Sequence, residues 1–190
     1  DTSYGLAVDI TNDEAVKKLY RVKQRGFNKP VHIVVDSLTQ AKAISIWNKF
    51  AGMVVKKYWP GAVSVVLPLK GKTKALKKFS AGTGTIGLRM PNNTIALDLV
   101  KQLKRPVTAT SANPSGKVSG GVDSYSAEDI IKQFSKQKYK PDIIIDAGKL
   151  PKRRPSTLVK LTETGDVEII RSGPISRKQI SNIIKFKSRK

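Results

Sequence analysis

Basic, hydroxyl and glycine residues gather in four short segments where a hydrophobic core would not require them. Arginine offers a planar fork that matches a phosphate or a carboxylate, and a loop rich in glycine and serine lets backbone N–H groups approach an anion closely. Singly, each segment has a simpler explanation as a helix cap, a solvated helix end, a surface residue or a loop. Together, they predict a site for a triphosphate. The segments are Thr2 with residues 4–6, residues 23–25 with Lys29 and Pro30, Arg89 between Gly87 and Pro91, and the loop 110–119.

The residues that common nucleotide sites and catalytic triads need are missing. The sequence has no G-x-x-x-x-G-K-S/T or G-x-G-x-x-G motif, no cysteine and a single histidine, His32. Without cysteine, disulfides, thiolate zinc sites and cysteine nucleophiles are excluded. His32 lies in an apolar strand, which is more typical of a histidine satisfied on a strand face than of a catalytic base. Phosphoryl or adenylyl transfer fits better, because it needs positioning and charge stabilisation rather than a protein nucleophile.

The overall charge indicates an anionic partner. The 190 residues include 36 Lys and Arg against 14 Asp and Glu, which gives a formal net charge of +22, and 39% of the residues are hydrophobic. This composition is that of a globular protein, and its charge allows nucleic acid, a membrane surface or a small anionic substrate as the partner. No apolar run approaches the ~20 residues that a membrane-spanning helix requires.

The spacing of apolar residues predicts the elements that must position the four segments. Thr11 and Glu14 are spaced as a capping box for a first helix that ends near Lys23. Further helices are expected within 39–58 (one or two), 70–78, 94–103, 126–134 and 176–184. Strands are expected over 31–36, 63–68, 85–90, 106–109, 142–145, 157–161 and 167–171, the last two joined by a turn at 163–165. This order predicts an α/β (α+β) fold with a twisted mixed β-sheet and flanking helices in one domain over 1–190, with a basic tail at about 185–190.

Six motifs, in order and over nearly the whole chain, resemble the threonylcarbamoyl-AMP synthase family, which has the YrdC-like fold. Each motif alone is weak, and the ordered set is specific. The motifs are residues 1–6, Lys23-x-Arg25 with Lys29-Pro30, Trp59-Pro60-Gly61 with Gly87-Leu88-Arg89-Met90-Pro91, Ser111-Ala112-Asn113-x-Ser115-Gly116, Pro155-Ser156-Thr157-Leu158-Val159 and Ile170-Arg171-x-Gly173.

The resemblance implies a fold and a reaction. The family fold is a twisted sheet around a large, open, positively charged cavity. Its enzymes are nucleotidyltransferases that join L-threonine, bicarbonate and ATP into threonylcarbamoyl-adenylate and release pyrophosphate. A downstream tRNA threonylcarbamoyl transferase complex then modifies an adenosine of certain tRNAs. The resemblance is to the short, single-domain, cytoplasmic form, and we expect a few N-terminal residues of the fold, including a Pro-Thr pair before Asp1, to be missing.

The resemblance also implies roles for individual residues. Catalytic roles fall to Lys23 and Arg25, which with Lys29 would face the phosphates. Mg²⁺ would arrive with ATP and bridge its phosphates, so no protein metal site is expected. The implied ATP site comprises Arg25, Lys29, Thr85, Ser111, Asn113, Ser119 and Arg171. The implied threonine site comprises Thr2, Arg89, which would fork onto the carboxylate, the backbone of Ala109, and Ser156.

Two other functions remain open at this point. Five lysines in 70–78 and seven basic residues without an acid in 171–190 are also typical of a basic protein that binds tRNA or double-stranded RNA without catalysis. Only 6% of the residues are aromatic, which disfavours base stacking and leaves weak tRNA binding as the expectation. The carbamoyl-transfer domain of hydrogenase maturation proteins shares the fold, but those long chains carry zinc-finger-like cysteines that are absent here.

Overall fold

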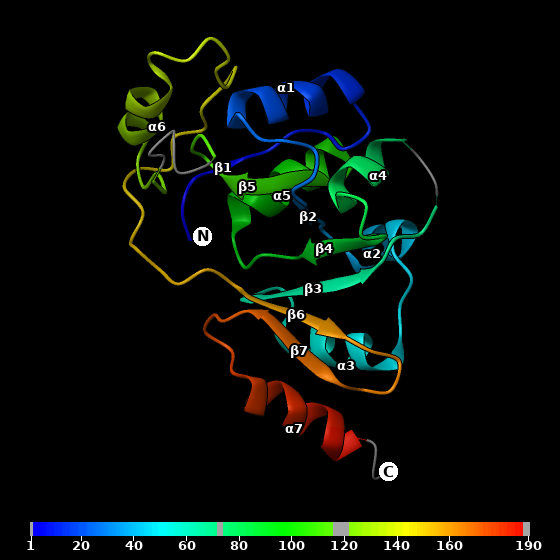
Figure 1. Cartoon of the computed structure of the whole chain (residues 1–190). Coiled ribbons are helices and arrows are strands. Elements are labelled where there is room, and N and C mark those ends of the chain that lie inside the picture. The colour runs from blue at the N-terminus through cyan, green and yellow to red at the C-terminus, as the bar shows by residue number, and fades with distance from the viewer. Residues whose placement is uncertain (1, 72–73, 116–121, 188–190) are drawn as a thin grey trace.

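A seven-stranded sheet in the order β1-β5-β2-β4-β3-β6-β7 organises the protein (Figure 1). The structure is a computed structural model that describes residues 2–71, 74–115 and 122–187. β2 is parallel to β4 and β3 is parallel to β6, whereas the other neighbours are antiparallel. The predicted mixed sheet is therefore confirmed. The strands are β1 Gly5–Leu6, β2 His32–Val34, β3 Val63–Pro68, β4 Thr85–Arg89, β5 Val107–Ser111, β6 Thr157–Leu161 and β7 Val167–Arg171.

Five of the helices begin at asparagine or serine caps, whose side chains accept hydrogen bonds from first-turn N–H groups. At the first helix the cap is Asn12, so the predicted capping box from Thr11 is wrong: the Thr11 hydroxyl donates to Asp9 instead. None of the helices in the described ranges is long and apolar enough to cross a membrane. The helices are α1 Asp13–Lys23, α2 Leu38–Ile44, α3 Lys49–Tyr58, α4 Lys74–Ser80, α5 Thr94–Leu103, α6 Ala127–Phe134 and α7 Arg177–Lys187.

One side of the sheet carries the fully buried residues of the central strands. Ile33, Val65, Leu88 and Val159 have no exposed surface and belong to one core cluster with apolar residues of α1 and α3. Alternate residues along a strand point to opposite sides, so the other side of the same strands is left for different side chains. The fold therefore separates a packing face from a face that can hold polar groups.

The predicted strand at 142–145 is wrong. Residues 135–156 form an extended surface segment that runs down one side of the molecule from α6 to β6 (Figure 1). No strand pairs with it in the described part of the chain, and Ile143 is 81% exposed. Three prolines (141, 151 and 155) lie in or beside this segment, where they lack N–H groups for a ladder. A run of isoleucines predicts a strand only where a partner strand is available.

The Tyr4 hydroxyl fastens this segment to the sheet. It accepts a hydrogen bond from the Ala147 N–H at 2.8 Å and lies 2.7 Å from the Gly148 carbonyl and 3.0 Å from the Asp146 carboxylate. The Tyr4 ring is itself buried beside β1. A segment without secondary structure is thus attached to a side chain near the other end of the chain, and the Leu150 N–H, which donates to the Tyr125 carbonyl at 2.7 Å, attaches it again.

We predict that Tyr4→Phe lowers the free energy of unfolding by about 0.5–1.5 kcal/mol, because the part-buried hydrogen bonds between the Tyr4 hydroxyl and residues 146–148 are lost. Urea unfolding followed by circular dichroism measures this change. Tyr139→Phe is the matched control, because the Tyr139 hydroxyl makes no hydrogen bond to any described residue. Equal losses of stability in the two variants would contradict the prediction.

Candidate functional site

The strand register brings five of the predicted site residues, Thr85, Arg89, Ala109, Ser111 and Arg171, to one face of the sheet. Residues paired across neighbouring strands share a face, and so do alternate residues of one strand. His32 pairs with Ala109, Val34 with Arg89, and Leu158 with both Ser64 and Arg171. The shared face, opposite the packing face, therefore carries Ser111 and Ala109 of β5, His32 of β2, Thr85, Gly87 and Arg89 of β4, Ser64 of β3 and Arg171 of β7.

Lys23 holds the loop that follows β5. The last residue of α1 is only 2% exposed, and its ammonium donates to the Ser111 carbonyl at 2.6 Å and to Asn113 Oδ1 at 2.9 Å. The Ser111 hydroxyl donates to the same Asn113 oxygen at 2.6 Å. Burial, and then the nearby Arg25, lower the pKa of Lys23 to about 8. The ammonium is thus placed to organise Ser111 and Asn113, and its contact with phosphates stays a prediction.

Arg171 and Ser156 form a second fixed unit. The Arg171 guanidinium donates from Nε to the Ser156 carbonyl at 3.1 Å and from Nη2 to the Ser156 hydroxyl at 3.0 Å. Gly173 crosses the same backbone so closely that a Cβ atom there would lie 2.3 Å from the Thr157 nitrogen. This approach explains physically why a glycine stands two residues after the arginine in the Ile170-Arg171-x-Gly173 motif.

Arg89 is anchored by the loop that carries the Trp59-Pro60-Gly61 motif. Its Nε donates to the Gly61 carbonyl at 3.1 Å, and the Gly61 N–H in turn donates to the Met90 carbonyl at 2.8 Å. Burial lowers the pKa of Arg89 to about 10, so the guanidinium remains charged at neutral pH. Two motifs that are separated in the sequence are therefore parts of one structural unit.

His32 lies at the centre of this face, and the sequence interpretation underestimated it. Its pKa is lowered to about 4 by burial and by the positive charges of Arg171, Arg25 and Arg89. None of the hydrogen bonds among the described residues involves its ring, and the residue is partly exposed. Gly87 provides the space, because a Cβ atom there would lie 2.5 Å from His32 Cδ2. Only the long-range pairing of β2 with its neighbours could have revealed this position.

Other predicted residues lie further away or outside the described ranges. Thr85 and Arg89 stand at opposite ends of β4, roughly 13 Å apart at the usual rise of a strand, and the Thr85 hydroxyl pairs with that of Thr83 at 2.9 Å. Thr2 and Lys29 are at least partly exposed, and no side-chain contact within the described chain ties them to the cluster. Ser119 falls outside the described residues.

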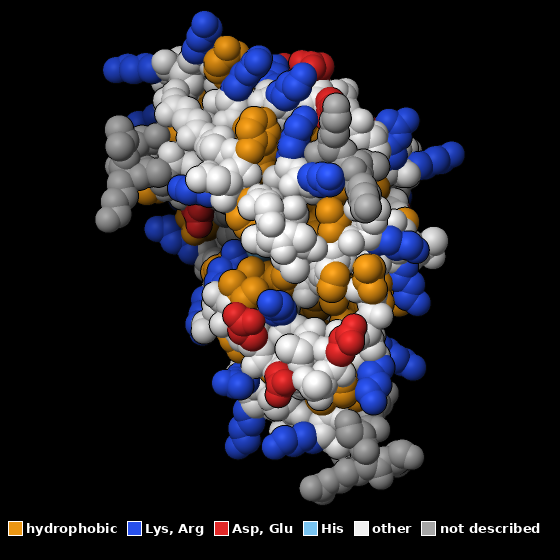
Figure 2. Space-filling model, turned by 45° about the vertical axis from the view of Figure 1, so that its right-hand side comes forward, with side chains coloured by type: hydrophobic (Ala, Val, Ile, Leu, Met, Phe, Trp, Pro, Cys, Tyr) orange, Lys and Arg blue, Asp and Glu red, His pale blue; other side chains and the backbone are white. Residues whose placement is uncertain are grey.

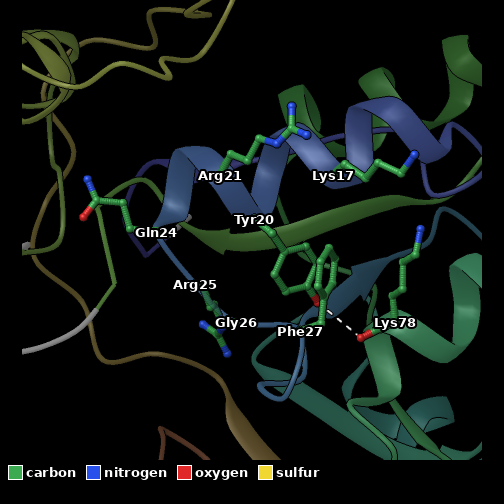
Figure 3. A pocket seen from close by; sticks show the side chains of 8 residues that line it. All are labelled: Lys17, Tyr20, Arg21, Gln24, Arg25, Gly26, Phe27 and Lys78. Atoms are coloured by element: carbon green, nitrogen blue, oxygen red, sulfur yellow. Dashed lines mark hydrogen bonds between the residues drawn. The ribbon is translucent and has the colours of Figure 1, made fainter.

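A pocket of about 600 Å³ lies between α1 and α4. The Tyr20 and Phe27 rings meet there with centroids 4.3 Å apart, and Phe27 is 46% exposed. Figure 3 shows the two rings side by side, with Arg25 directed away from them. The Arg25 guanidinium donates to the Pro30 carbonyl at 2.7 Å, while its Nε is buried without a partner. The large, open, positively charged cavity implied by the resemblance stays a prediction.

The site face is cationic and holds no set of metal ligands. Within residues 2–71, 74–115 and 122–187, no three His, Cys, Asp or Glu side chains lie close enough together to bind a metal ion. Asp123 is the carboxylate whose charge acts on Lys23 and Arg171. This donor set does not fit a protein-held divalent cation, and it fits an anionic ligand.

Comparisons with known proteins agree with this geometry. Residues 1–173 match the model of a family described as Sua5_yciO_yrdC, telomere recombination. The chain is 32% identical to the threonylcarbamoyl-AMP synthase of Pyrococcus abyssi over 97% of its own length and 52% of that protein, so it spans about half of it. It is 33% identical to a putative threonylcarbamoyl-AMP synthase of Methanocaldococcus jannaschii over 92% of its length and 77% of that protein. The crystal structure of P. abyssi Sua5 complexed with L-threonine superposes with a TM-score of 0.83, at 31% identity, over 96% of this chain and 51% of that one.

We predict that His32 titrates with a midpoint near pH 4, because three guanidinium groups and burial disfavour its protonated form. The folded pKa lies below the ordinary value of 6.5, so the unfolded chain binds more protons between these values. The free energy of unfolding is therefore unaffected by His32 above about pH 6.5. It decreases as the pH falls toward 4, because protons bind more tightly to the unfolded chain. Since the chain has one histidine, its ring C–H resonances in NMR report the titration without ambiguity. A midpoint between 6 and 7 would contradict the described cluster.

Proposed function

This chain belongs to the Sua5/YciO/YrdC family, and on that premise we propose that it is an L-threonylcarbamoyladenylate synthase. Threonine and bicarbonate form a carbamate with loss of water. A carbamate oxygen then forms a bond to the α-phosphorus of ATP as the bond to pyrophosphate breaks. The product serves the modification of tRNA in the cytoplasm. The observation that carries the proposal is the single sheet face on which Arg89, Arg171 and His32 meet, in a chain whose relatives bear this name.

The predicted cations divide between the two substrates. Arg89 pairs with the threonine carboxylate, and a relative, P. abyssi Sua5, has been crystallised with L-threonine. Arg25, Lys29 and Arg171 oppose the phosphates and stabilise the charge that grows on the pyrophosphate leaving group. His32 remains neutral between these arginines, so it adds no further positive charge. Fixed side chains and charge stabilisation are sufficient for this chemistry, which needs no protein nucleophile.

The proposal includes Mg²⁺ as a companion of ATP. A divalent cation bridges phosphate oxygens and neutralises their charge when bound. The cationic site face does not fit a protein cage for such an ion, so the ATP phosphates themselves supply its ligands.

Pyrophosphate release tests the proposed reaction. The wild-type protein should release pyrophosphate from ATP only when threonine and bicarbonate are both present.

Arg89→Ala should lower kcat/KM for threonine about tenfold to a hundredfold, because charge-assisted hydrogen bonds to the carboxylate are lost. Arg105→Ala is the matched control, since Arg105 pairs with Asp9 at 2.7 Å on the surface. Equal release with threonine or bicarbonate omitted would refute the reaction.

We also propose that the surface of α1 attracts tRNA weakly. Figure 2 shows basic side chains spread over the face that it draws rather than gathered in a single patch, so charge alone selects no binding surface on this face. The pocket beside α1 differs from the rest of this basic surface, because its lining combines Lys and Arg side chains with the exposed Phe27 ring. Arg21 lies 5.6 Å from the ring centroid of Tyr139 and extends this arrangement of cations and aromatic rings. Cations interleaved with accessible rings are typical of surfaces that contact looped RNA.

Arg21→Ala should weaken tRNA binding roughly threefold to tenfold and lower the slope of log K against log salt by about one, because one phosphate contact is lost. Arg177→Ala is the control, since α7 lies at the far end of the molecule from α1 (Figure 1). Filter binding over a salt series gives both quantities. Equal effects of the two substitutions would show that the attraction is not localised.

A further inference from the structure

A buried serine lies behind the predicted threonine site. Ser64 is a polar residue in the apolar strand β3, and it has no exposed surface. Its hydroxyl oxygen lies 2.8 Å from that of Ser156, and it makes no other side-chain hydrogen bond within the described chain. The strand neighbours Val63 and Val65 are core residues, so a hydroxyl at this position requires an explanation.

The direction of the hydrogen bond between the two serines follows from counting donors and acceptors. A hydroxyl group has one proton and can accept two hydrogen bonds. The Ser64 proton has one acceptor within reach, the Ser156 oxygen. Leaving a buried donor unpaired is costly, because its desolvation is not repaid. Ser64 is therefore the donor, and Ser156 the acceptor.

Arg171 uses the other acceptor position of the same oxygen. Its Nη2 donates to the Ser156 hydroxyl at 3.0 Å, and its Nε holds the Ser156 carbonyl at 3.1 Å. With both acceptor positions taken, the Ser156 proton must point elsewhere, and no described residue accepts it. Ser156 is only 3% exposed, so bulk water is a poor partner. A ligand that enters the site can supply the acceptor.

We propose that Ser64 is a positioning residue that, together with Arg171, makes Ser156 an obligatory hydrogen-bond donor to the threonine carboxylate. This inference rests on the proposed function for the identity of the ligand. The charge around the site agrees with an anionic acceptor, because Arg89 and Arg171 share this face with Ser156. Without the Ser64 hydroxyl, the Ser156 oxygen loses one of the two hydrogen bonds that fix its orientation, so its proton is no longer held toward the ligand.

Calorimetric binding of L-threonine and of L-threoninol, which has a hydroxymethyl group in place of the carboxylate, tests this role. Ser64→Ala should weaken binding of L-threonine about threefold to tenfold and raise its KM by a similar factor. Binding of threoninol, kcat and the KM for ATP should change less than twofold. Ser64→Cys, which keeps a weak donor, should lie between Ser64→Ala and the wild type.

Ser45→Ala is the matched control. Ser45 is 2% exposed, and its hydroxyl donates to the Ala41 carbonyl at 2.6 Å and accepts from the Trp47 indole at 2.9 Å, within a different hydrogen-bond group. It should lose stability in thermal unfolding while its threonine affinity stays unchanged. A loss of affinity for threonine and threoninol alike in Ser64→Ala would indicate general damage to the fold and overturn the role.

The outcomes separate the two proposals. Unchanged threonine binding in Ser64→Ala would overturn the role of Ser64 and leave the proposed reaction intact. A wild-type protein that binds threonine and releases no pyrophosphate would overturn the reaction, while the binding comparison would still decide the role of Ser64. A wild-type protein that binds no threonine would overturn both.

Discussion

The site depends on cations that donate hydrogen bonds to backbone carbonyl groups of neighbouring segments. Lys23 donates to the carbonyl of Ser111, Arg89 to that of Gly61, and Arg171 to that of Ser156. A carbonyl dipole satisfies an N–H group and fixes its direction, but it does not cancel a unit charge. These carbonyl contacts therefore fix where the cations of the face lie. Burial first, and then neighbouring arginines, lower the pKa of Lys23 and of His32.

The regular elements could be predicted because their signals are local. Apolar spacing and caps identify α1, α3, α5 and α6, and the apolar runs identify β3, β4 and β6. The 142–145 run has the same local signal as a strand, but it finds no partner because the surface segment passes outside the sheet. Asn12 and Thr11 are both acceptable caps by type, and only the backbone geometry at the helix start selects Asn12.

The site could be predicted only as separate parts. The arginines and the hydroxyl-rich loop can be identified from the sequence alone, because their residue types bind anions and because glycine, proline or serine residues stand next to them in the chain. His32 and Ser64 were missed because their surroundings come from distant segments: His32 needs the space above Gly87, and Ser64 contacts a residue 92 positions away. Residue type carries no information about such pairings. The register of the strands decides them, and no short motif records it.

The Tyr4 anchor has a further consequence for the surface segment that precedes Ser156. This segment contains Lys152, Arg153 and Arg154, all exposed and therefore accessible to trypsin-like proteases. Tyr4 holds residues 146–148 on one side, and the Thr157 N–H donates to the Ala62 carbonyl on the other. A cut between these two attachment points would leave both new ends in place. The protein could thus be nicked here into two fragments that remain associated, each carrying part of the site.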